Sequence, residues 1–507
     1  MKEKIRQRIR RGKRRIERRL ARAQKRKDSG RPVMSSRRVS YRVANRVRAM
    51  GHGGILATHQ VAVETGLVAR IDARLKLLKV HRPYHESDHV LNIAYNALCG
   101  GRTLDDIELR RNDEAFLDAL GTAAIPDPTT AGDFCRRFSA PDIDILMDAI
   151  NETRLEVWKR QGPDFVQTTA RIDADGSLVG TTGECKEGMA LSYNGVWGYH
   201  PLLVSLANTS EPLFIVNRSG NRPSHEQAPA YLDKAIDLCR RAGFQDVLLR
   251  GDTDFSMTTQ LDRWDADGVR FVFGYSAHPS LKAGADSLAD REYQRLVREA
   301  NRVFQGRRRA RQPRVKEQVV RDKGYKNIKL RSEDVAEFDY KPTSCSRTYR
   351  MVVLRKNLTV ERGEQALFDD VRYFFYITND RQLEPNEVVR ESNQRCNQEN
   401  LIAQLKDGVR ALHAPVNTLD ANWAYMVMSS LAWSLKAWMA LSLPIDPRWR
   451  TKHRAERDRW LRMEFRTFCN AVIQMPAQVV ATGRRVVIRL LCWRPQQPVL
   501  FRLLNAL

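Results

Sequence analysis

Two short acidic clusters have the composition and spacing of metal-binding sites. One spans residues 173–177 (DADGS) and the other residues 250–255 (RGDTDF), and each stands at the end of a strand-like segment. The carboxyl ends of strands in an open α/β sheet face the crevice in which such proteins do their chemistry. In each cluster two acids are two residues apart, so an extended backbone points both to one side. Each cluster therefore offers a metal ligand, and the residues alone leave open which acid it is.

A third carboxylate stands in a helical segment at residues 393–406 (NQRCNQENLIAQLK). Helical spacing places Arg395, Glu399, Ile402 and Lys406 on one face. The single acid would hold metal while the two cations hold DNA phosphates. Three acids can bind hard cations such as Mg²⁺, and two ions about 4 Å apart clamp the attacking and leaving oxygens of a phosphodiester displacement. The alternatives are an exposed Arg–Glu ion pair and ordinary surface acids.

The positive charge of the chain is concentrated in two segments. The 507 residues contain 86 Lys and Arg against 60 Asp and Glu, a net charge of +26. Residues 1–27 hold fifteen bases against two acids, and residues 302–331 hold twelve against two, which together account for +23. Local basic clusters of this kind suit contacts to DNA phosphates. The alternative is two solvated charge runs without a partner.

Several protein classes are disfavoured. The eight cysteines are scattered without a CxxC pair, which argues against a zinc knuckle or a disulfide framework and fits a reducing cytoplasm. No Gly-rich phosphate loop is present, so no nucleotide cofactor is expected. The basic N-terminus lacks the apolar region of a signal peptide. The apolar run Trp423–Leu443 contains Lys436, so we expect a buried helix and no membrane partner.

The pattern of apolar residues, which predicts the elements that position these acids, changes along the chain. Residues 55–160 have helical spacing, with helix starts expected at 102–106 and at 127–130, where a Thr would act as cap. From residue 166 the pattern is strand, strand, strand, helix, strand, helix, strand, which suits a mixed α/β sheet. The strands are expected at 166–175, 199–207, 212–217, 246–250 and 269–273, and the helices at 226–242 and 257–265.

The second half of the chain breaks this α/β pattern and then resumes it. Short polar and strand-like pieces fill residues 275–370, and a strong strand at Tyr373–Thr378 precedes the helix that carries Glu399. Helices follow over residues 419–475, and a terminal strand is expected at Arg484–Leu490. The α/β unit is therefore expected to be interrupted by an insert of nearly a hundred residues.

At these residues the sequence resembles the DDE transposases of bacterial insertion sequences, in the group with a Tyr, Arg, Glu, Lys signature and an insertion before the catalytic Glu. That signature has Arg four residues before Glu and Lys seven after it, as Arg395, Glu399 and Lys406 do here. Its Tyr would fall at Ser392, which puts the DNA contact of that Tyr in doubt. Segments 175–177, 199–203 (YHPLL), 250–255 and 374–379 (FFYITN) also resemble the family, over about residues 50–505.

The resemblance implies an α/β fold with a ribonuclease-H-like catalytic core interrupted by an insertion domain, an all-helical N-terminal domain and a mainly helical C-terminal region. It implies Asp175, Asp252 and Glu399 as catalytic residues and metal ligands, with Asp173 as the rival first ligand. The cofactor would be Mg²⁺, with Mn²⁺ as a substitute. The enzyme would cleave at the inverted-repeat ends of its element and join the 3′ hydroxyl ends to target DNA by two-metal-ion chemistry.

The expected partners are transposon-end double-stranded DNA and target DNA, bound by a homodimer because two ends must be joined. The expected domains are a basic arm (1–33), a helical DNA-binding domain (34–165), a catalytic domain (166–275 and 371–445), a basic insertion domain (276–370) and a C-terminal region (446–507). Met34 and Met50 are alternative starts that would exclude much of the arm. The expected DNA contacts are Arg395, Lys406, Arg136, Arg137, Arg307, Arg308, Arg309 and Lys326.

The resemblance also implies a protein of the bacterial cytoplasm that associates with the nucleoid when it acts. Two other functions are alternatives to transposition. A metal-dependent nuclease of the same fold would cut without strand transfer, and a DNA-binding protein without catalysis would not need candidates for all three acids. His81, His85 and His89 have a spacing of four residues that suggests zinc, against the simpler expectation of surface or capping histidines. Tyr325 lies among lysines and could stack on a DNA base.

Overall fold

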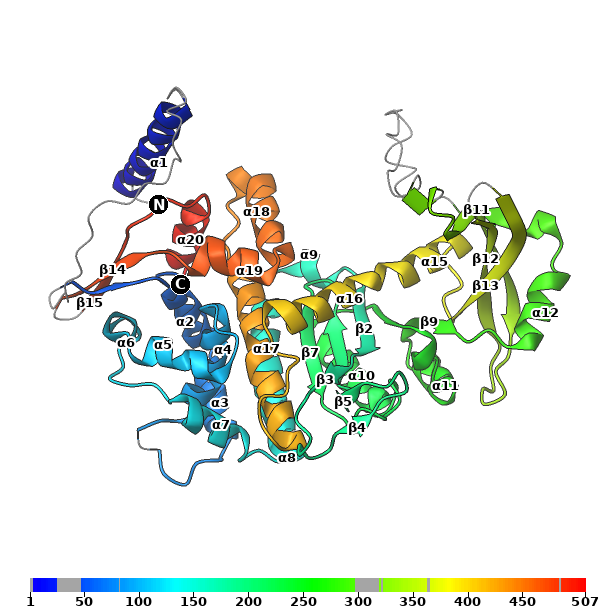
Figure 1. The fold of residues 1–507 in the computed structure, drawn as a ribbon, viewed down its shortest axis with the longest axis horizontal. Coiled ribbons are helices and arrows are strands. Elements are labelled where there is room, and N and C mark those ends of the chain that lie inside the picture. Colours follow the sequence, from blue (N-terminus) through cyan, green and yellow to red (C-terminus); the bar gives the residue numbers. More distant parts are fainter. Residues whose placement is uncertain are drawn as a thin grey trace.

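The protein combines a helical module, a large mixed sheet and a C-terminal group of helices (Figure 1). The structure is a computed structural model that describes residues 3–24, 47–81, 83–296, 319–320, 322–362, 365–482 and 485–507. Residues 25–33 of the expected basic arm and the cluster Arg307, Arg308 and Arg309 lie outside these ranges. The mixed α/β architecture expected from the order of elements is confirmed.

The main sheet has nine strands in the order β10-β11-β12-β13-β9-β8-β2-β6-β7. Strand β6 runs antiparallel to β2 and β7 runs antiparallel to β6, whereas β8 and β9 run parallel to β2. The register pairs Asp173 with Arg250 across β2 and β8, so the two strands end at the same edge of the sheet. The central strands are β2 (Ala170–Gly176), β6 (Leu202–Leu206), β7 (Glu211–Val216), β8 (Val247–Gly251) and β9 (Arg270–Tyr275).

Two of the expected strands are shorter than their sequence pattern suggested. The strand expected from residue 166 begins at Ala170, because Pro163 starts the helical turn α9 (Pro163–Val166). The single strand expected over residues 199–207 is divided between two strands. Tyr199 ends β5 (Trp197–Tyr199), and Pro201 precedes β6. Strand β5 forms a small sheet with β3 (Val179–Gly180) and β4 (Ala190–Leu191).

The expected insertion contains long strands that continue the main sheet. After α11 (Thr258–Ala266) and β9 come α12 (Pro279–Ser287), η3 (Asp290–Glu292), β10 (Gln294–Arg295), β11 (Lys326–Tyr340), β12 (Tyr349–Arg362) and β13 (Gln365–Thr378). The prediction of short strand-like pieces in this region is therefore wrong. Register shifts at Leu330/Ser332 and Val360/Glu361 interrupt the alternation that would have identified long strands. Strand β13 joins this antiparallel group to β9.

The helical module precedes the sheet. It contains α2 (Ile55–Glu64), α3 (Leu67–Arg74), α4 (Glu86–Leu98), η1 (Leu104–Ile107), α5 (Glu108–Arg111), α6 (Glu114–Leu120), α7 (Pro128–Cys135) and α8 (Ala140–Lys159). Thr103 forms a capping box with Asp106, as its position indicated. The cap of α7 is Asp127, whose Oδ1 accepts from the Thr130 N–H at 2.9 Å. The expected Thr cap is wrong, because Asp127 stands directly before Pro128 at the first helical position.

Helix α17 (Leu419–Leu441) stands between the helical module and the main sheet (Figure 1). Its residues from Ala421 onward are buried, including Trp423, Trp433 and Trp438, which confirms the expected buried helix. Buried Glu211 on β7 accepts from Arg154 Nε at 3.0 Å and from the indoles of Trp158 and Trp438. No helix in the described part of the chain has the length and apolar character needed to cross a membrane.

The remaining elements lie around these units. Helix α10 (Ala228–Ala242) packs on β2, β6, β7 and β8. The C-terminal group comprises η5 (Pro447–Trp449), α18 (Arg450–Arg462), α19 (Phe465–Phe468), η6 (Cys469–Ile473) and α20 (Gln497–Leu504). A second sheet pairs β1 (Ala49–Met50), β14 (Ala477–Thr482) and the expected terminal strand β15 (Arg485–Leu490). The basic helix α1 (Glu3–Gln24) contacts α20.

Candidate active site

Asp175 and Asp252 lie at one edge of the sheet. Asp175 is the sixth residue of β2, and Asp252 directly follows β8. Because β2 and β8 are parallel neighbours with Asp173 opposite Arg250, each of the two acids lies two residues beyond this pair. Asp252 Oδ1 accepts from the N–H of Asp254 at 3.0 Å, which orients the carboxylate at the start of η2 (Thr253–Phe255).

Glu399 reaches this edge on a separate helix. Helices α15 (Pro385–Gln394) and α16 (Cys396–Ala403) are divided by a turn at Arg395. Gln398, 2% exposed, donates from Nε2 to the Leu203 carbonyl at 3.2 Å and accepts from the Ser205 hydroxyl. Leu203 lies opposite Asp175 in the β2–β6 register, so Gln398 fixes α16 over the end of β2. The next residue, Glu399, is exposed on the solvent side of this contact.

Asp252 links the three acids electrostatically. Burial raises the pKa of Asp175 to about 6, the Arg395 guanidinium opposes that rise, and the Asp252 carboxylate adds to it. Burial also raises the pKa of Asp252, Arg395 again opposes the rise, and Asp254 and Glu399 add to it. These couplings place the three carboxylates in one electrostatic environment, with the cation of Arg395 among them.

This donor set fits a hard divalent cation. Carboxylate oxygens are the ligands that Mg²⁺ and Mn²⁺ prefer, and a cation relieves the repulsion among neighbouring carboxylates. Arg395 Nη1 lies 3.1 Å from Asp175 Oδ2 and supplies positive charge at this place. Within the described residues, the acids Asp175, Asp252 and Glu399 do not bring their ligand atoms to within 4.8 Å of one another. Closure around an ion would therefore require Arg395 and the acids to shift.

Asp173 has a different environment from Asp175. It is 1% exposed, and both of its oxygens are engaged by Arg250, with Nε–Oδ1 at 2.7 Å and Nη2–Oδ2 at 2.9 Å. Arg250 Nη1 also donates to the carbonyl and carboxylate of Glu391, whose oxygens bind Arg171. The buried network joins β2, β8 and α15 beneath the acids. The geometry therefore favours Asp175 as the ligand and Asp173 as a support.

The cations expected beside Glu399 are not on one regular helix. The turn at Arg395 ends α15, and the π-helical segment η4 (Gln404–Gly408) contains Lys406. The prediction of one continuous helical face is therefore wrong, because the backbone changes its hydrogen-bond pattern on both sides of α16. Burial lowers the pKa of the Lys406 ammonium, while the charges of Asp407 and Asp175 raise it. Both cations nevertheless act on the acid site.

The other expected DNA contacts that fall within the described ranges lie away from the acids. Arg136 and Arg137 are exposed at the end of α7 in the helical module, and Arg136 pairs with Asp133 at 2.5 Å. Lys326 begins β11, at the far end of the main sheet in Figure 1, and its Nζ lies 5.8 Å from the Phe368 ring centroid. Tyr325 beside it is 57% exposed. The structure therefore distributes these residues over two separate surfaces.

His200 is a site residue that the sequence interpretation missed. Its Nδ1 lies 2.8 Å from the Arg222 carbonyl, which can only accept, so Nδ1 carries the proton and Nε2 keeps a lone pair. A Cβ added to Gly176 would lie 2.6 Å from this Nε2, so only glycine fits beside Asp175. Burial lowers the pKa of His200, which keeps the ring neutral near pH 7. The segment 199–203 resembles the family, but nothing in its sequence indicates that its histidine lies beside Asp175.

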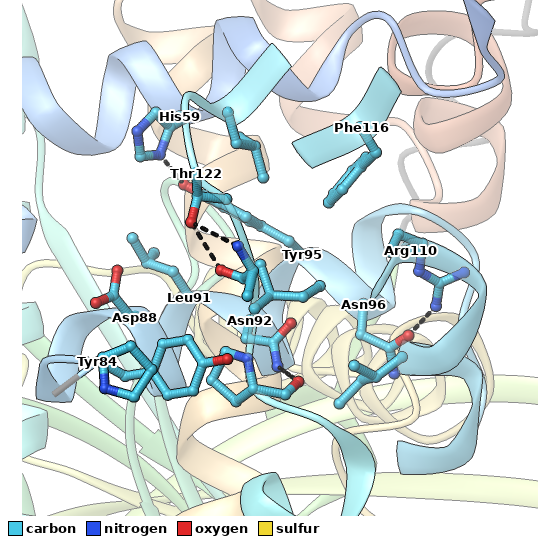
Figure 2. A pocket seen from close by; sticks show the side chains of 16 residues that line it. His59, Tyr84, Asp88, Leu91, Asn92, Tyr95, Asn96, Arg110, Phe116 and Thr122 are labelled. Carbon is cyan, nitrogen blue, oxygen red and sulfur yellow. Dashed lines mark hydrogen bonds between the residues drawn. The ribbon is translucent and has the colours of Figure 1, made fainter. Parts of the chain in front are cut away.

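A cavity of about 120 Å³ lies in the helical module, apart from the acids (Figure 2). Within it His59 Nδ1 lies 2.9 Å from the Tyr95 hydroxyl, and Asn92 Nδ2 donates to the Pro126 carbonyl at 2.9 Å. Arg110 donates to Asn96 on another wall. Most of these polar groups therefore have partners, as in a structural core, although the buried Nε of Arg110 has none among the described residues.

Comparisons with known proteins identify the wider group. A family model described as transposase DDE domain group 1 matches residues 33–507. The cryo-EM structure of the piggyBac transposase synaptic complex with hairpin DNA is similar at 10% sequence identity and a TM-score of 0.35, covering 83% of this chain and 82% of that chain. No curated protein matches the chain. The family match spans the helical module, the main sheet and the C-terminal helices.

Proposed function

The chain belongs to the transposase DDE domain group 1 family, and from this membership we propose that it is the transposase of a bacterial insertion sequence. As a DDE transposase it cleaves DNA and joins strands in DNA transposition. In our proposal it cleaves at the inverted-repeat ends of its element and joins the 3′ hydroxyl ends to target DNA. The observation that carries this proposal is that Asp252, at one sheet edge, is coupled electrostatically to Asp175 on one side and to Glu399 on the other.

The catalytic core in this proposal is ribonuclease-H-like. Its five strands, in order across the sheet, are β7, β6, β2, β8 and β9. Each of the first three is antiparallel to its neighbour, and β8 and β9 run parallel to β2. We assign the core to residues 166–275 and 371–445, with 34–165 as the DNA-binding helical domain, 276–370 as the insertion and 446–507 as the C-terminal region. The spacing of Arg395, Glu399 and Lys406 supports membership of the group with the Tyr, Arg, Glu, Lys signature.

Asp175, Asp252 and Glu399 would hold the Mg²⁺ ions, or Mn²⁺ in their place, which when bound supply Lewis-acid activation of the attacking oxygen and neutralise charge at phosphorus. Asp173 and Arg250 keep the ends of β2 and β8 in register beneath these ligands. Gln398 holds the start of α16 so that Glu399 reaches the same edge. These contacts affect the reaction rate, because small displacements of the reacting groups slow the reaction strongly.

In this proposal the neighbouring cations bind DNA phosphates, and the neighbouring histidine can accept a proton. Arg395 and Lys406 bind phosphates next to the scissile bond, and Arg395 leaves Asp175 when a phosphate offers it another anion. Nε2 of His200 is free to accept a proton at the Asp175 edge. More distant phosphates contact Arg136, Arg137 and Lys326, and a homodimer brings the two transposon ends together.

A strand-transfer assay tests the proposal. The full chain is incubated with Mg²⁺, a duplex ending in the inverted repeat that flanks its gene, and a target plasmid. Joined products are expected, and Asp252→Ala or Glu399→Ala should abolish them while Asp458→Ala, an exposed α18 substitution, should not.

Each other result selects another function. Nicks at the repeat without joining would favour a nuclease of the same fold. Binding without nicks would favour a DNA-binding protein without catalysis. Unchanged joining by the Asp252→Ala and Glu399→Ala variants would overturn the assignment of the site.

A further inference from the structure

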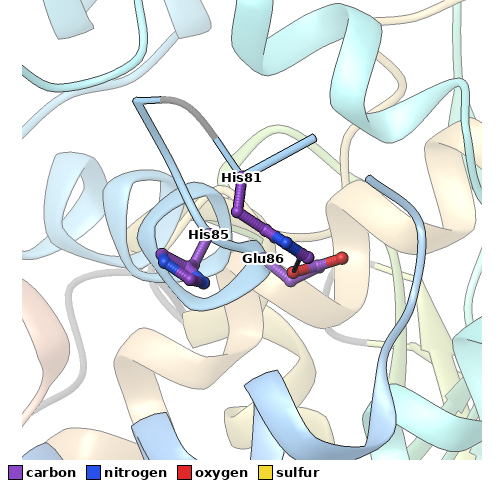
Figure 3. A group of neighbouring side chains, drawn as sticks. All are labelled: His81, His85 and Glu86. Atoms are coloured by element: carbon purple, nitrogen blue, oxygen red, sulfur yellow. Dashed lines mark hydrogen bonds and ion pairs between the residues drawn. The ribbon is translucent and has the colours of Figure 1, made fainter. Parts of the chain in front are cut away.

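A second cluster of potential metal ligands lies in the helical module, where the loop after α3 meets the start of α4. Figure 3 shows His81, His85 and Glu86 grouped at this place. One ligand atom from each residue can be chosen so that all lie within 4.8 Å of one another. The His81 and His85 rings are stacked with centroids 4.8 Å apart and planes 11° apart, and His81 Nε2 lies 3.0 Å from Glu86 Oε2.

Glu86 is fixed in a way that suits a ligand. Its side chain is 1% exposed, and its Oε1 accepts from the N–H groups of Leu77 and Leu78, both at 3.0 Å. These bonds orient the carboxylate and direct Oε2 to His81. A buried carboxylate is costly unless positive charge or hydrogen bonds compensate it. In the described structure the side chain that meets Oε2 is an imidazole, so a cation held between the two would complete the compensation.

The third residue of the cluster differs from the one that sequence spacing suggested. His89 was the expected partner, but its ring is buried against Phe134, with centroids 4.3 Å apart and planes 10° apart. The helical spacing fails because α4 begins only at Glu86, so His81 and His85 lie outside the helix. The loop brings them to Glu86, a residue that the spacing of histidines could not reveal.

We propose that His81, His85 and Glu86 bind one transition-metal ion of the Zn²⁺ type. Two imidazoles and one carboxylate are typical donors for Zn²⁺, whereas the oxygen donors near Asp175 suit Mg²⁺. At Zn–N distances of about 2 Å, the ligand atoms must approach to about 3.3 Å, so the rings must move by an ångström or more. His81 and His85 are exposed and can adjust, with His85 at the N-cap of α4 in a capping box with Asp88, while Glu86 provides the fixed point.

The bound ion would act as a structural clasp. It would tie His81 and His85 to Glu86 in the first turn of α4, and α4 packs directly on the central helix α17. The fourth position would hold water, because the described neighbourhood offers three ligands in this cluster. The site lies apart from the sheet edge of the proposed function, so each can be tested without the other.

Metal binding to the intact chain tests the clasp. The protein is stripped with a chelator and dialysed against Zn²⁺ in the presence of excess Mg²⁺, and bound zinc is measured by mass spectrometry of the metal. The Co²⁺-loaded protein is compared by its visible absorption, which reports nitrogen ligands and low coordination number. Wild-type protein should bind one zinc ion at this site and unfold at higher temperature with zinc than without it.

The variants His81→Ala and His85→Ala should each lower zinc affinity at least about tenfold, and the double variant should lose both the bound ion and the thermal shift. Both side chains are exposed, so these changes leave the core intact. The variant Asp252→Asn, which alters the other carboxylate site, and His225→Ala, an exposed histidine elsewhere, should retain the ion. Equal zinc binding by the double variant and the wild type, or no zinc bound by the wild type, would overturn the proposal.

Discussion

Replacing Asp175 with Asn should stabilise the protein while it abolishes strand transfer. Burial raises the pKa of Asp175 to about 6 from an ordinary value of 3.8, against the opposing effect of Arg395. The Asp175 side chain is only 15% exposed, so solvent screens little of this effect. At about 1.4 kcal/mol for each pKa unit, the charged carboxylate costs the folded state about 3 kcal/mol.

The pH dependence of this gain follows from the direction of the shift. Because the folded state binds the proton more tightly than the unfolded state, the carboxylate does not destabilise the fold below the unfolded pKa. Its cost grows as the pH rises from about 4 to about 6 and is constant above that range. Asn carries no charge, so the variant should match the wild type at low pH and exceed its stability by about 3 kcal/mol near pH 7.5.

Urea unfolding of the two proteins without divalent metal, at several pH values across this range, measures the effect. The exposed α18 variant Asp458→Asn serves as the control, and its difference from the wild type should not follow this pH curve. Millimolar Mg²⁺ should raise the stability of the wild type more than that of the variant, because a bound cation neutralises the carboxylates. A variant that is less stable than wild type at pH 7.5, or a gain independent of pH, would refute the reasoning.

Three further substitutions test other parts of the structure. Gln398→Ala should slow single-turnover strand transfer by about 10-fold to 100-fold with DNA affinity unchanged, because Glu399 loses its anchor; an unchanged rate would contradict this role. Glu211→Gln should lower the free energy of unfolding by about 3–5 kcal/mol, since it leaves the buried Arg154 without its anion; a urea midpoint like that of wild type would disprove it. Lys406→Ala should weaken DNA binding and lower the slope of log affinity against log salt concentration by about one phosphate contact. Salt titration of DNA binding measures this slope, and an unchanged slope would contradict the phosphate contact.

The sequence predicted the central sheet better than its extension. The strands β8 and β9 and helices α10 and α11 lie within two residues of their expected positions, because each has a compact apolar pattern bounded by turn residues. The strands β11 and β12 were missed as long elements, since register shifts interrupt their alternation and much of β11 is exposed. Their continuation of the main sheet depends on the pairing of β13 with β9, a long-range contact that no local pattern contains.

For the site, the sequence identified candidate acids but not their environments. Asp173 and Asp175 are equivalent by their spacing on one strand. Only the register opposite Arg250 distinguishes Asp173, whose two oxygens pair with Arg250, from Asp175, which has a single contact from Arg395. Glu391 and His200 were missed for the same reason, because their roles arise from contacts made across the fold. The turn at Arg395 was also hidden, since the residues on both sides of it favour helix.

The distribution of charge around the acids explains why support and catalysis fall to different residues. Asp173 is fully buried, yet two guanidinium bonds compensate it, so it can hold β2 and β8 together as a fixed ion pair. Asp175 has one contact from Arg395, and the turn that carries Arg395 interrupts the helix. That contact can be exchanged for a metal ion while the Asp173 pair remains. The strongly compensated acid therefore provides rigidity, and the weakly compensated acid retains the affinity for a cation that the reaction requires.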